Sequence, residues 1–132
     1  MKKRELMALG LSDYQATEAV RKIKYRLKQE LPLYANKRIA FVPTSEVAHY
    51  LFGVSREEPL PDNPVQAFKQ RLITLSELTT QIGSPQEARM IIRTAQRHMV
   101  EQGCDFYQNV RHWIVPQEAV EQILFKHSKE KN

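Results

Sequence analysis

The chain has 132 residues, of which 42% are hydrophobic, which is enough for one ordinary domain or two very small ones. It has no apolar run near the roughly 18–20 residues of a membrane span, no secretory signal, and a single cysteine, Cys104, which excludes an intramolecular disulfide. Its 20 Lys and Arg against 15 Asp and Glu give a net charge of +5, which favours an acidic partner. We therefore expect a soluble cytoplasmic protein without a membrane partner, a metal site or a cofactor.

An internal repeat organises the chain. Residues 5–52 match residues 77–125, at a spacing of 72 positions up to the long helix and of 73 positions after it. The identical pairs include Glu5-Leu6 with Glu77-Leu78, Ala16 with Ala88, Arg21 with Arg93, Tyr34 with Tyr107, Arg38 with Arg111, Val42-Pro43 with Val115-Pro116, Val47 with Val120 and Leu51-Phe52 with Leu124-Phe125. We infer that one small module was duplicated.

The repeat divides the chain into four segments. Two units of the same fold are expected over 1–53 and 73–127, joined by a proline-rich linker or irregular arm over 54–72. The end of that linker, 64–72, has the composition of a short helix, and 128–132 is expected to be a frayed tail. Units of about 50 residues are each marginally stable, so we expect them to pack together or to be stabilised by a partner.

Each unit begins with a short helix, a tight turn and a long helix. The short helices are expected over 3–9 and 75–82, with Gly10 and Gly83 in the turns that follow them. Capping boxes are expected at Ser12 with Gln15, Thr74 with Glu77 and Ser84 with Glu87. The apolar stripes of the long helices are Ala16, Ala19, Val20, Ile23, Leu27 and Leu31 in the first, which Pro32 ends, and Ala88, Ile91, Ile92, Ala95 and Met99 in the second, which Gly103 caps.

Each long helix is followed by two short β-like runs and a final helix. The runs are residues 33–35 and 38–42 in the first unit and 105–107 and 112–115 in the second, and we predict that each pair forms a hairpin. The final helices are expected over 44–52 and 117–125. Helix, turn, helix, hairpin and helix is the order of a small winged helix-turn-helix unit. The predicted fold class is therefore mainly α with small β-hairpins, in two tandem units.

Three segments carry a resemblance to a known family. Residues 38–51 and 112–124 resemble the end of the excisionase-type, MerR-like winged helix-turn-helix, in which a basic hairpin leads into an aromatic-aliphatic strand, a proline and a last helix. Residues 77–103 resemble its helix-turn-helix part, with a longer second helix. The chain is also similar to a family of short proteins found near integrase genes in mobile elements of Gram-positive bacteria, which typically contain one such unit. The resemblance implies DNA binding beside a recombinase.

A recognition helix presents donors to phosphates and base edges from its exposed face, and a wing contacts the flanking backbone. The candidate DNA-binding residues are Gln15, Thr17, Arg21, Lys22, Lys24, Tyr25, Lys28, Asn36, Lys37 and Arg38 in the first unit, and Gln86, Arg89, Arg93, Arg97, Asn109, Arg111 and His112 in the second. Two other interpretations stay open: the long helices are only solvated basic faces, and the Asn residues only serve turns. Trp113 is expected to pack in the core beneath the wing.

The net charge lies on the first unit. Residues 1–53 hold ten Lys and Arg against five acidic residues, whereas residues 54–72 hold three of each and residues 73–132 seven of each. Because nonspecific affinity grows with the number of phosphates neutralised, the first unit is expected to be the stronger electrostatic binder. The second unit either contacts DNA through its arginine stripe or serves packing or dimerisation, and the sequence leaves both open.

The expected function is sequence-specific binding of double-stranded DNA. The four His residues are scattered and Cys104 has no flanking cation, so no catalytic role is expected. The resemblance implies an excisionase-like accessory or directionality factor of a mobile element, associated with the nucleoid and with a site-specific recombinase. A transcriptional repressor and a replication accessory protein are alternatives, and a homodimer is open. An alternative of another class is a protein-binding module whose basic helix docks an acidic partner.

Overall fold

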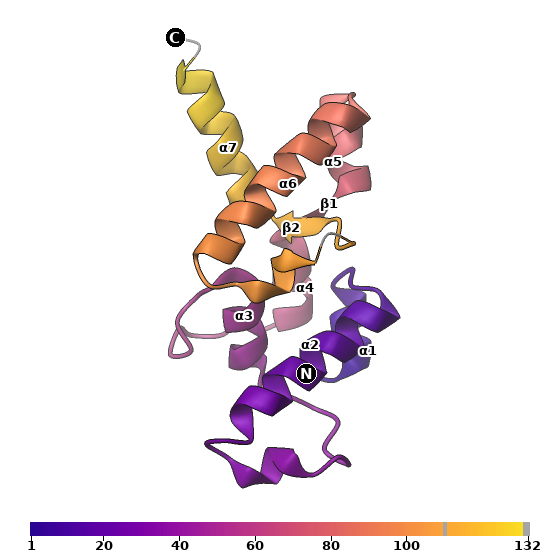
Figure 1. Ribbon diagram of the computed structural model, residues 1–132, viewed down its shortest axis with the longest axis vertical. Coiled ribbons are helices and arrows are strands. Elements are labelled where there is room, and N and C mark those ends of the chain that lie inside the picture. The colour runs from indigo at the N-terminus through magenta and orange to yellow at the C-terminus, as the bar shows by residue number, and fades with distance from the viewer. Residues whose placement is uncertain (110, 131–132) are drawn as a thin grey trace. The chain divides into compact units, whose positions relative to one another are not determined.

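The computed structural model describes residues 1–109 and 111–130 (Figure 1). The chain divides into two compact units, Met1–Lys69 and Gln70–Asn132. Among the described residues, no helix combines the length and the apolar character needed to cross a membrane.

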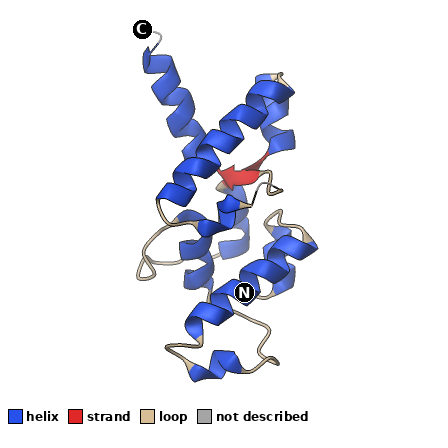
Figure 2. Cartoon of the chain, in the orientation of Figure 1, coloured by secondary structure: helices blue, strands red, loops and turns tan. Residues whose placement is uncertain are grey.

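The first unit is helical throughout most of its length (Figure 2). Its elements are α1 (Lys3–Ala8), α2 (Asp13–Leu27), the 3₁₀ helix η1 (Pro32–Ala35), α3 (Thr44–Phe52) and α4 (Pro64–Gln70). A fully buried Leu6 on α1 packs with the buried stripe of α2, formed by Ala16, Ala19, Ile23 and Leu27. This stripe is the predicted one except at Val20, which is half-buried, and at Leu31.

The second unit repeats this order and adds a small sheet. Its elements are β1 (Leu72–Thr74), α5 (Leu75–Ile82), α6 (Pro85–Glu101), the 3₁₀ helix η2 (Asp105–Gln108), β2 (Ile114–Pro116) and α7 (Gln117–Glu130). The core gathers Leu78 from α5, the α6 stripe of Ala88, Ile92, Ala95 and Met99, the aromatic pair Phe106 and Tyr107, and Ile114, Val115 and Val120. The predicted short helix 75–82 and the start of the last helix at Gln117 are confirmed.

Local hydrogen bonds explain where the helices begin and end. The Ser12 hydroxyl accepts from the Gln15 amide at 3.1 Å, and Gln15 Oε1 accepts from the Ser12 amide at 2.8 Å, so the predicted capping box is present. Thr74 and Glu77 form the same box on α5. Gly83 ends α5 with φ +83°, and Gly103 follows α6 with φ +98°, a left-handed conformation that favours glycine at both positions.

Each unit contains an antiparallel pairing, and the two pairings join equivalent positions. In the second, β1 pairs with β2 so that Ile73 faces Val115 and Thr74 faces Ile114. In the first, the single bridge joins Lys2 to Phe41, the positions equivalent to Thr74 and Ile114 by the repeat spacing. The fold is thus mainly helical with a small two-stranded antiparallel sheet, in two tandem units, as the sequence predicts.

The prediction of a hairpin after each long helix is wrong, because the two short runs do not pair with each other. Residues 33–35 and 105–107 lie in η1 and η2, not in strands. The strand β2 pairs instead with β1, which precedes the short helix. A 3₁₀ turn at these places buries Tyr34 and Tyr107, and Pro32 opens η1 at a position where its missing N–H is harmless. Packing of these tyrosines in the core therefore outweighs the local β propensity of residues 33–35 and 105–107.

The structure also bears on three smaller expectations, at the end of α2, in the linker and in the tail. Leu31 lies beyond the end of α2 and is 49% exposed, so it is not part of the apolar stripe. The predicted helix at the end of the linker is present as α4, whose buried Phe68 lies edge-on to Phe52 with ring centroids 5.4 Å apart. The backbone of α7 is helical through residues 128–130 of the expected tail, and residues 131 and 132 lie outside the described part of the chain.

Candidate nucleic-acid interface

Helix α2 exposes a basic face opposite its buried stripe. Of the predicted residues on this helix, Thr17, Arg21, Lys22, Tyr25 and Lys28 are exposed, and Gln15 and Lys24 are half-buried. Lys28 Nζ lies 4.3 Å from the centre of the Tyr25 ring, a cation–π contact on the surface. The amphipathic pattern therefore leaves cations and an aromatic side chain facing solvent on one side of a 15-residue helix.

The segment after η1 is held against α2 by Lys24. Its ammonium donates to the Ile39 carbonyl at 2.5 Å and to the Asn36 carbonyl at 3.2 Å. The Asn36 side-chain oxygen accepts from the Arg38 amide at 2.9 Å, which makes Asn36 part of the turn itself. Lys37 and Arg38 are exposed at this turn. The structure thus brings these two cations into a segment fastened to the basic helix.

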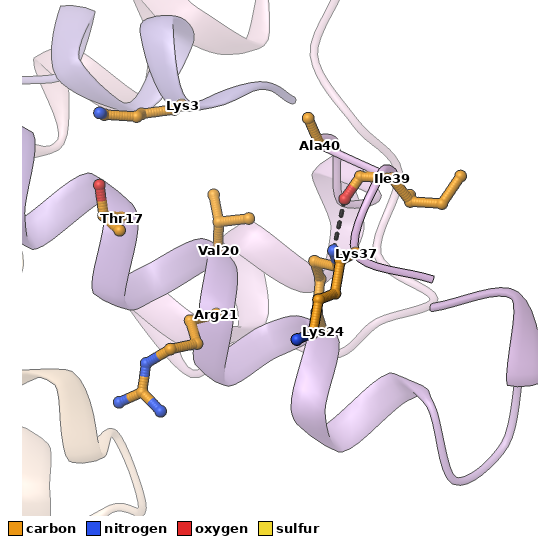
Figure 3. A pocket seen from close by; sticks show the side chains of 8 residues that line it. All are labelled: Lys3, Thr17, Val20, Arg21, Lys24, Lys37, Ile39 and Ala40. Carbon is orange, nitrogen blue, oxygen red and sulfur yellow. Dashed lines mark hydrogen bonds between the residues drawn. The ribbon is translucent and has the colours of Figure 1, made fainter. Parts of the chain in front are cut away.

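A groove of about 390 Å³ opens between α2, the start of α1 and this segment (Figure 3). Its lining consists of four cationic side chains, one hydroxyl and three apolar side chains: Lys3, Arg21, Lys24, Lys37, Thr17, Val20, Ile39 and Ala40. Figure 3 shows Val20 pointing from α2 into the space below Ala40 and Ile39. The groove therefore combines an apolar floor with cations around it.

Two of these cations have acidic partners on α2. Lys3 Nζ lies 2.8 Å from Asp13 Oδ1, and the Arg21 guanidinium lies 2.9 Å from Glu18 Oε2. The hydrogen bond to Glu18 raises the pKa of Arg21. Asp13 and Arg21 are exposed and Lys3 and Glu18 are half-buried, and ion pairs this close to solvent contribute little to stability, so a phosphate can replace the carboxylate at small cost.

Sequence reasoning missed part of this groove. In the sequence, Lys3 contributes only to the net charge and to the predicted helix over 3–9, and the three- and four-residue pattern predicts Val20 in the core. Ile39 and Ala40 lie in a predicted strand. Val20 is half-buried, and its burial depends on the path of residues 37–40. No local sequence pattern predicts that path.

The equivalent segment of the second unit is fastened in the same manner. Gln96 is buried, and its Nε2 donates to the Ile114 carbonyl at 3.1 Å and to the His112 carbonyl. Asn109 Oδ1 accepts from the Arg111 amide at 2.9 Å, as Asn36 does for Arg38. Asn109 and Arg111 are exposed. The two turns are therefore built alike.

The prediction that His112 lies at an exposed tip is wrong. The side chain is 5% exposed and stacks on Phe106, with ring centroids 4.7 Å apart and planes 18° from parallel. The turn at Asn109 directs the chain inward at this point, because the His112 amide donates to the Asn109 carbonyl at 3.1 Å. His112 therefore supports the core of the second unit.

The arginine stripe on α6, formed by Arg89, Arg93 and Arg97, is not uniformly exposed. Gln86, Arg89 and Arg97 are exposed, but Arg93 is half-buried. Its guanidinium lies 3.6 Å from the centre of the Trp113 ring and donates to Gln96 Oε1 at 2.9 Å. Burial lowers the pKa of Arg93. Trp113 itself is half-buried against this arginine. Arg93 therefore has a structural role that its place in the stripe does not reveal.

A buried carboxylate links three parts of the first unit. Glu46 on α3 is 9% exposed and forms ion pairs with Arg26 of α2 and with Arg56, whose Nε lies 3.0 Å from Glu46 Oε1. The sequence signals that could have indicated this are the acidic first turn of α3 and the off-stripe Arg26, but neither predicts the pairing.

Cys104 is buried beside η2. Desolvation, with a smaller contribution from the charge of Asp105, raises the pKa of its thiol. A protonated and buried thiol is a poor nucleophile and a poor metal ligand. Among the side chains that the structure describes, in residues 1–109 and 111–125, no group of three His, Cys, Asp or Glu has an arrangement that would hold a metal ion.

Comparison with known proteins places the chain in a family. No curated protein and no solved structure matches it. A family of protein domains matches twice, over residues 1–55 and again over residues 71–126, which confirms the two tandem copies. The chain therefore belongs to the family described as a domain of unknown function (DUF3173) and contains two copies of that domain.

Proposed function

We propose that this protein binds double-stranded DNA, with α2 of the first unit in the major groove and the segment 36–40 on the adjacent phosphate backbone. At about 1.5 Å per residue, the 15 residues of α2 extend about 22 Å, and the diameter of an α-helix with its side chains, about 10–12 Å, suits a groove about 12 Å wide. Arg21, Lys22 and Lys28 supply donors from the exposed face of the helix.

One observation carries the proposal. Lys24 fastens the segment 36–40 to α2 through two backbone carbonyls, so Lys37 and Arg38 stand in a fixed relation to the cations of the helix. Cations on a preorganised scaffold lose less conformational entropy when they meet a polyanion than cations on a free loop. The exposed Tyr25, held by Lys28, adds a rigid flat side chain to the same face.

The more specific part of the proposal, an excisionase-like role, rests on the resemblance. Each unit is interpreted as a winged helix-turn-helix in which the turn at Asn36 or Asn109 takes the place of a long wing. The protein then acts as an excisionase-like accessory factor that marks or bends DNA beside a recombinase. Two linked modules raise the effective concentration of one half-site for the other, which allows weak individual contacts to add.

Fluorescence anisotropy with a random duplex of about 25 base pairs tests the proposal. The full chain is expected to bind at about 50 mM salt, and the logarithm of the affinity is expected to fall linearly with the logarithm of the salt concentration. Lys22→Glu with Arg38→Glu should weaken binding by at least about tenfold, because two phosphate contacts become repulsive.

The control is Lys69→Glu, which makes the charge change of one of these two substitutions at an exposed position of α4, outside the proposed interface. It is expected to have a small effect. Absence of binding at low salt, or equal losses for the control and the double variant, contradicts the proposal. In that case a protein partner with an acidic surface becomes the better explanation of the basic face.

A further inference from the structure

One of the differences between the two units lies at the groove. By the repeat spacing of 73, Ala40 in the first unit corresponds to Trp113 in the second, and Arg21 corresponds to Arg93 at a spacing of 72. In the second unit the Trp113 ring lies against the Arg93 guanidinium. In the first unit a methyl group stands where the indole begins, and Arg21 pairs with Glu18 instead.

The groove of the first unit is therefore the place that a ring fills in the second. The volume of about 390 Å³ lies at the small end of the range for ligand sites, about 300–1,000 Å³. Its apolar lining comes from Val20, Ile39 and Ala40, and Figure 3 shows Val20 and Ala40 bordering the open space from α2 and from the segment 36–40. A flat aromatic group with the size of an indole fits these conditions. Arg21, which corresponds to Arg93, pairs with Glu18 and points away from Ala40 in Figure 3, so it would have to leave Glu18 to stack on the ring.

The cations around the groove specify the chemistry of that ring. Lys3, Arg21 and Lys37 line it together with Lys24. Guanidinium and ammonium groups beside an apolar floor suit a ring joined to a phosphate, and a purine nucleotide carries both. A bare aromatic side chain of a protein supplies no anion, whereas a phosphate can contact Lys37 and compete with Asp13 and Glu18 for Lys3 and Arg21.

We propose that this groove, defined by the eight lining residues named above, takes up one unpaired purine of bound DNA, with its phosphate on Lys3, Arg21 or Lys37. The inference rests on the proposed DNA binding and goes beyond it. It assigns the first unit a base-holding role, which the second unit lacks because Trp113 occupies its own groove.

Three duplexes of the same length provide the test with the full chain. One is fully paired, one carries a single bulged adenine, and one carries an abasic bulge with the same number of phosphates. The bulged adenine is expected to bind about tenfold more tightly than the abasic bulge, since stacking of one base contributes about 5- to 150-fold. A 2-aminopurine in the bulge should change its fluorescence on binding, because the free base becomes stacked.

The variant Ala40→Trp fills the groove in the way that the second unit does. It should abolish the preference for the bulged adenine over the abasic bulge, and this ratio of two affinities does not depend on any change in the general affinity for duplex. Ala40→Ser is the matched control and should keep the preference. If Ala40→Trp does not fold, as judged by circular dichroism, the adenine against abasic comparison on the unaltered chain still decides the question.

The outcomes separate this inference from the function on which it rests. Equal affinity for the adenine and abasic bulges, with normal binding of the paired duplex, overturns the groove proposal and leaves DNA binding intact. No binding of the paired duplex at low salt overturns DNA binding itself. A preference that persists in a folded Ala40→Trp variant means that the base binds elsewhere, which also overturns the groove proposal.

Discussion

Lys24 and Gln96 stand 72 residues apart at equivalent places of the two units, and each fastens to its own long helix the segment that follows it. Lys24 donates to the carbonyls of Asn36 and Ile39, and Gln96 donates to those of His112 and Ile114. The first unit makes this contact with the ammonium of a half-buried lysine, and the second with the neutral amide of a buried glutamine. The duplicated module has kept the contact and changed its chemistry.

The first prediction concerns Lys24. Lys24→Gln is expected to keep the contact, because the second unit uses glutamine there, whereas Lys24→Met should lower the free energy of unfolding by about 1–2 kcal/mol. Urea titration measures the difference. Lys22→Met, at an exposed position on the same helix, serves as the control and should change stability by less than about 0.5 kcal/mol. Equal effects of Lys24→Met and Lys22→Met would show that the segment needs no fastening.

The second prediction concerns Gln96. Gln96→Leu leaves the His112 and Ile114 carbonyls without their amide donor, so a loss of about 2–3 kcal/mol of stability is expected. Hydrogen exchange of the α6 amides measures it within the second unit. Gln86→Leu, on the exposed first turn of α6, is the control. A Gln96→Leu variant as stable as the unaltered chain would contradict the assigned role.

The third prediction concerns the carboxylate between two arginines. Glu46→Gln keeps the shape of the side chain and removes its charge, which leaves Arg26 and Arg56 without their ionic partner. The expected loss is about 1–3 kcal/mol, measured by urea unfolding. The exposed Glu58→Gln makes the same change without such partners and should be nearly neutral. Comparable losses in both variants would mean that Glu46 adds nothing beyond an ordinary surface charge.

The fourth prediction concerns Cys104 and alkaline pH. Burial raises the pKa of the thiol in the folded state, so the unfolded chain loses this proton first, from about pH 8.5 upward. This contribution to the free energy of unfolding is complete below that pH and is lost as the pH rises towards the folded-state pKa. Urea unfolding at pH 7.5 and 9.5 should therefore show a larger loss for the unaltered chain than for Cys104→Ala. Identical losses would contradict the assignment.

The fifth prediction separates the arginines of α6. Arg93→Met removes the stacking on Trp113 and the bond to Gln96, and should cost about 1–2 kcal/mol of stability. Arg89→Met and Arg97→Met should be nearly neutral for folding. A change of DNA affinity in the Arg89 and Arg97 variants would therefore report contact between the second unit and DNA. An Arg93 variant that is fully stable would contradict the stacking role.

Helix positions were predictable because their signals are local. The boxes at Ser12 and Thr74 and the glycines at 83 and 103 act within a few residues, and they fall where the sequence places them. The strand partner was not predictable in this way. Ile73 pairs with Val115 across 42 positions, so short-range alternation in residues 105–115 suggested a hairpin with the wrong partner.

The candidate site was predictable only in part. Exposure of Arg21, Lys22 and Lys28 follows from the helical period. The burial of His112 and the stacking of Arg93 on Trp113 depend on how the chain after η2 returns to α6, which composition and spacing do not encode. The groove was not predictable either. Ala40 and Trp113 both lie in segments that the sequence predicts as strands, and the two side chains differ only in the space that they leave.

The salt dependence of duplex binding tests the central claim most directly. Each phosphate contact contributes about 0.9 to the slope of log affinity against log salt. Lys22→Met with Arg38→Met removes two proposed contacts and should reduce the slope by about 1.8, whereas Lys69→Met should leave it unchanged. A double variant with the slope of the unaltered chain would mean that α2 and the segment 36–40 do not meet DNA.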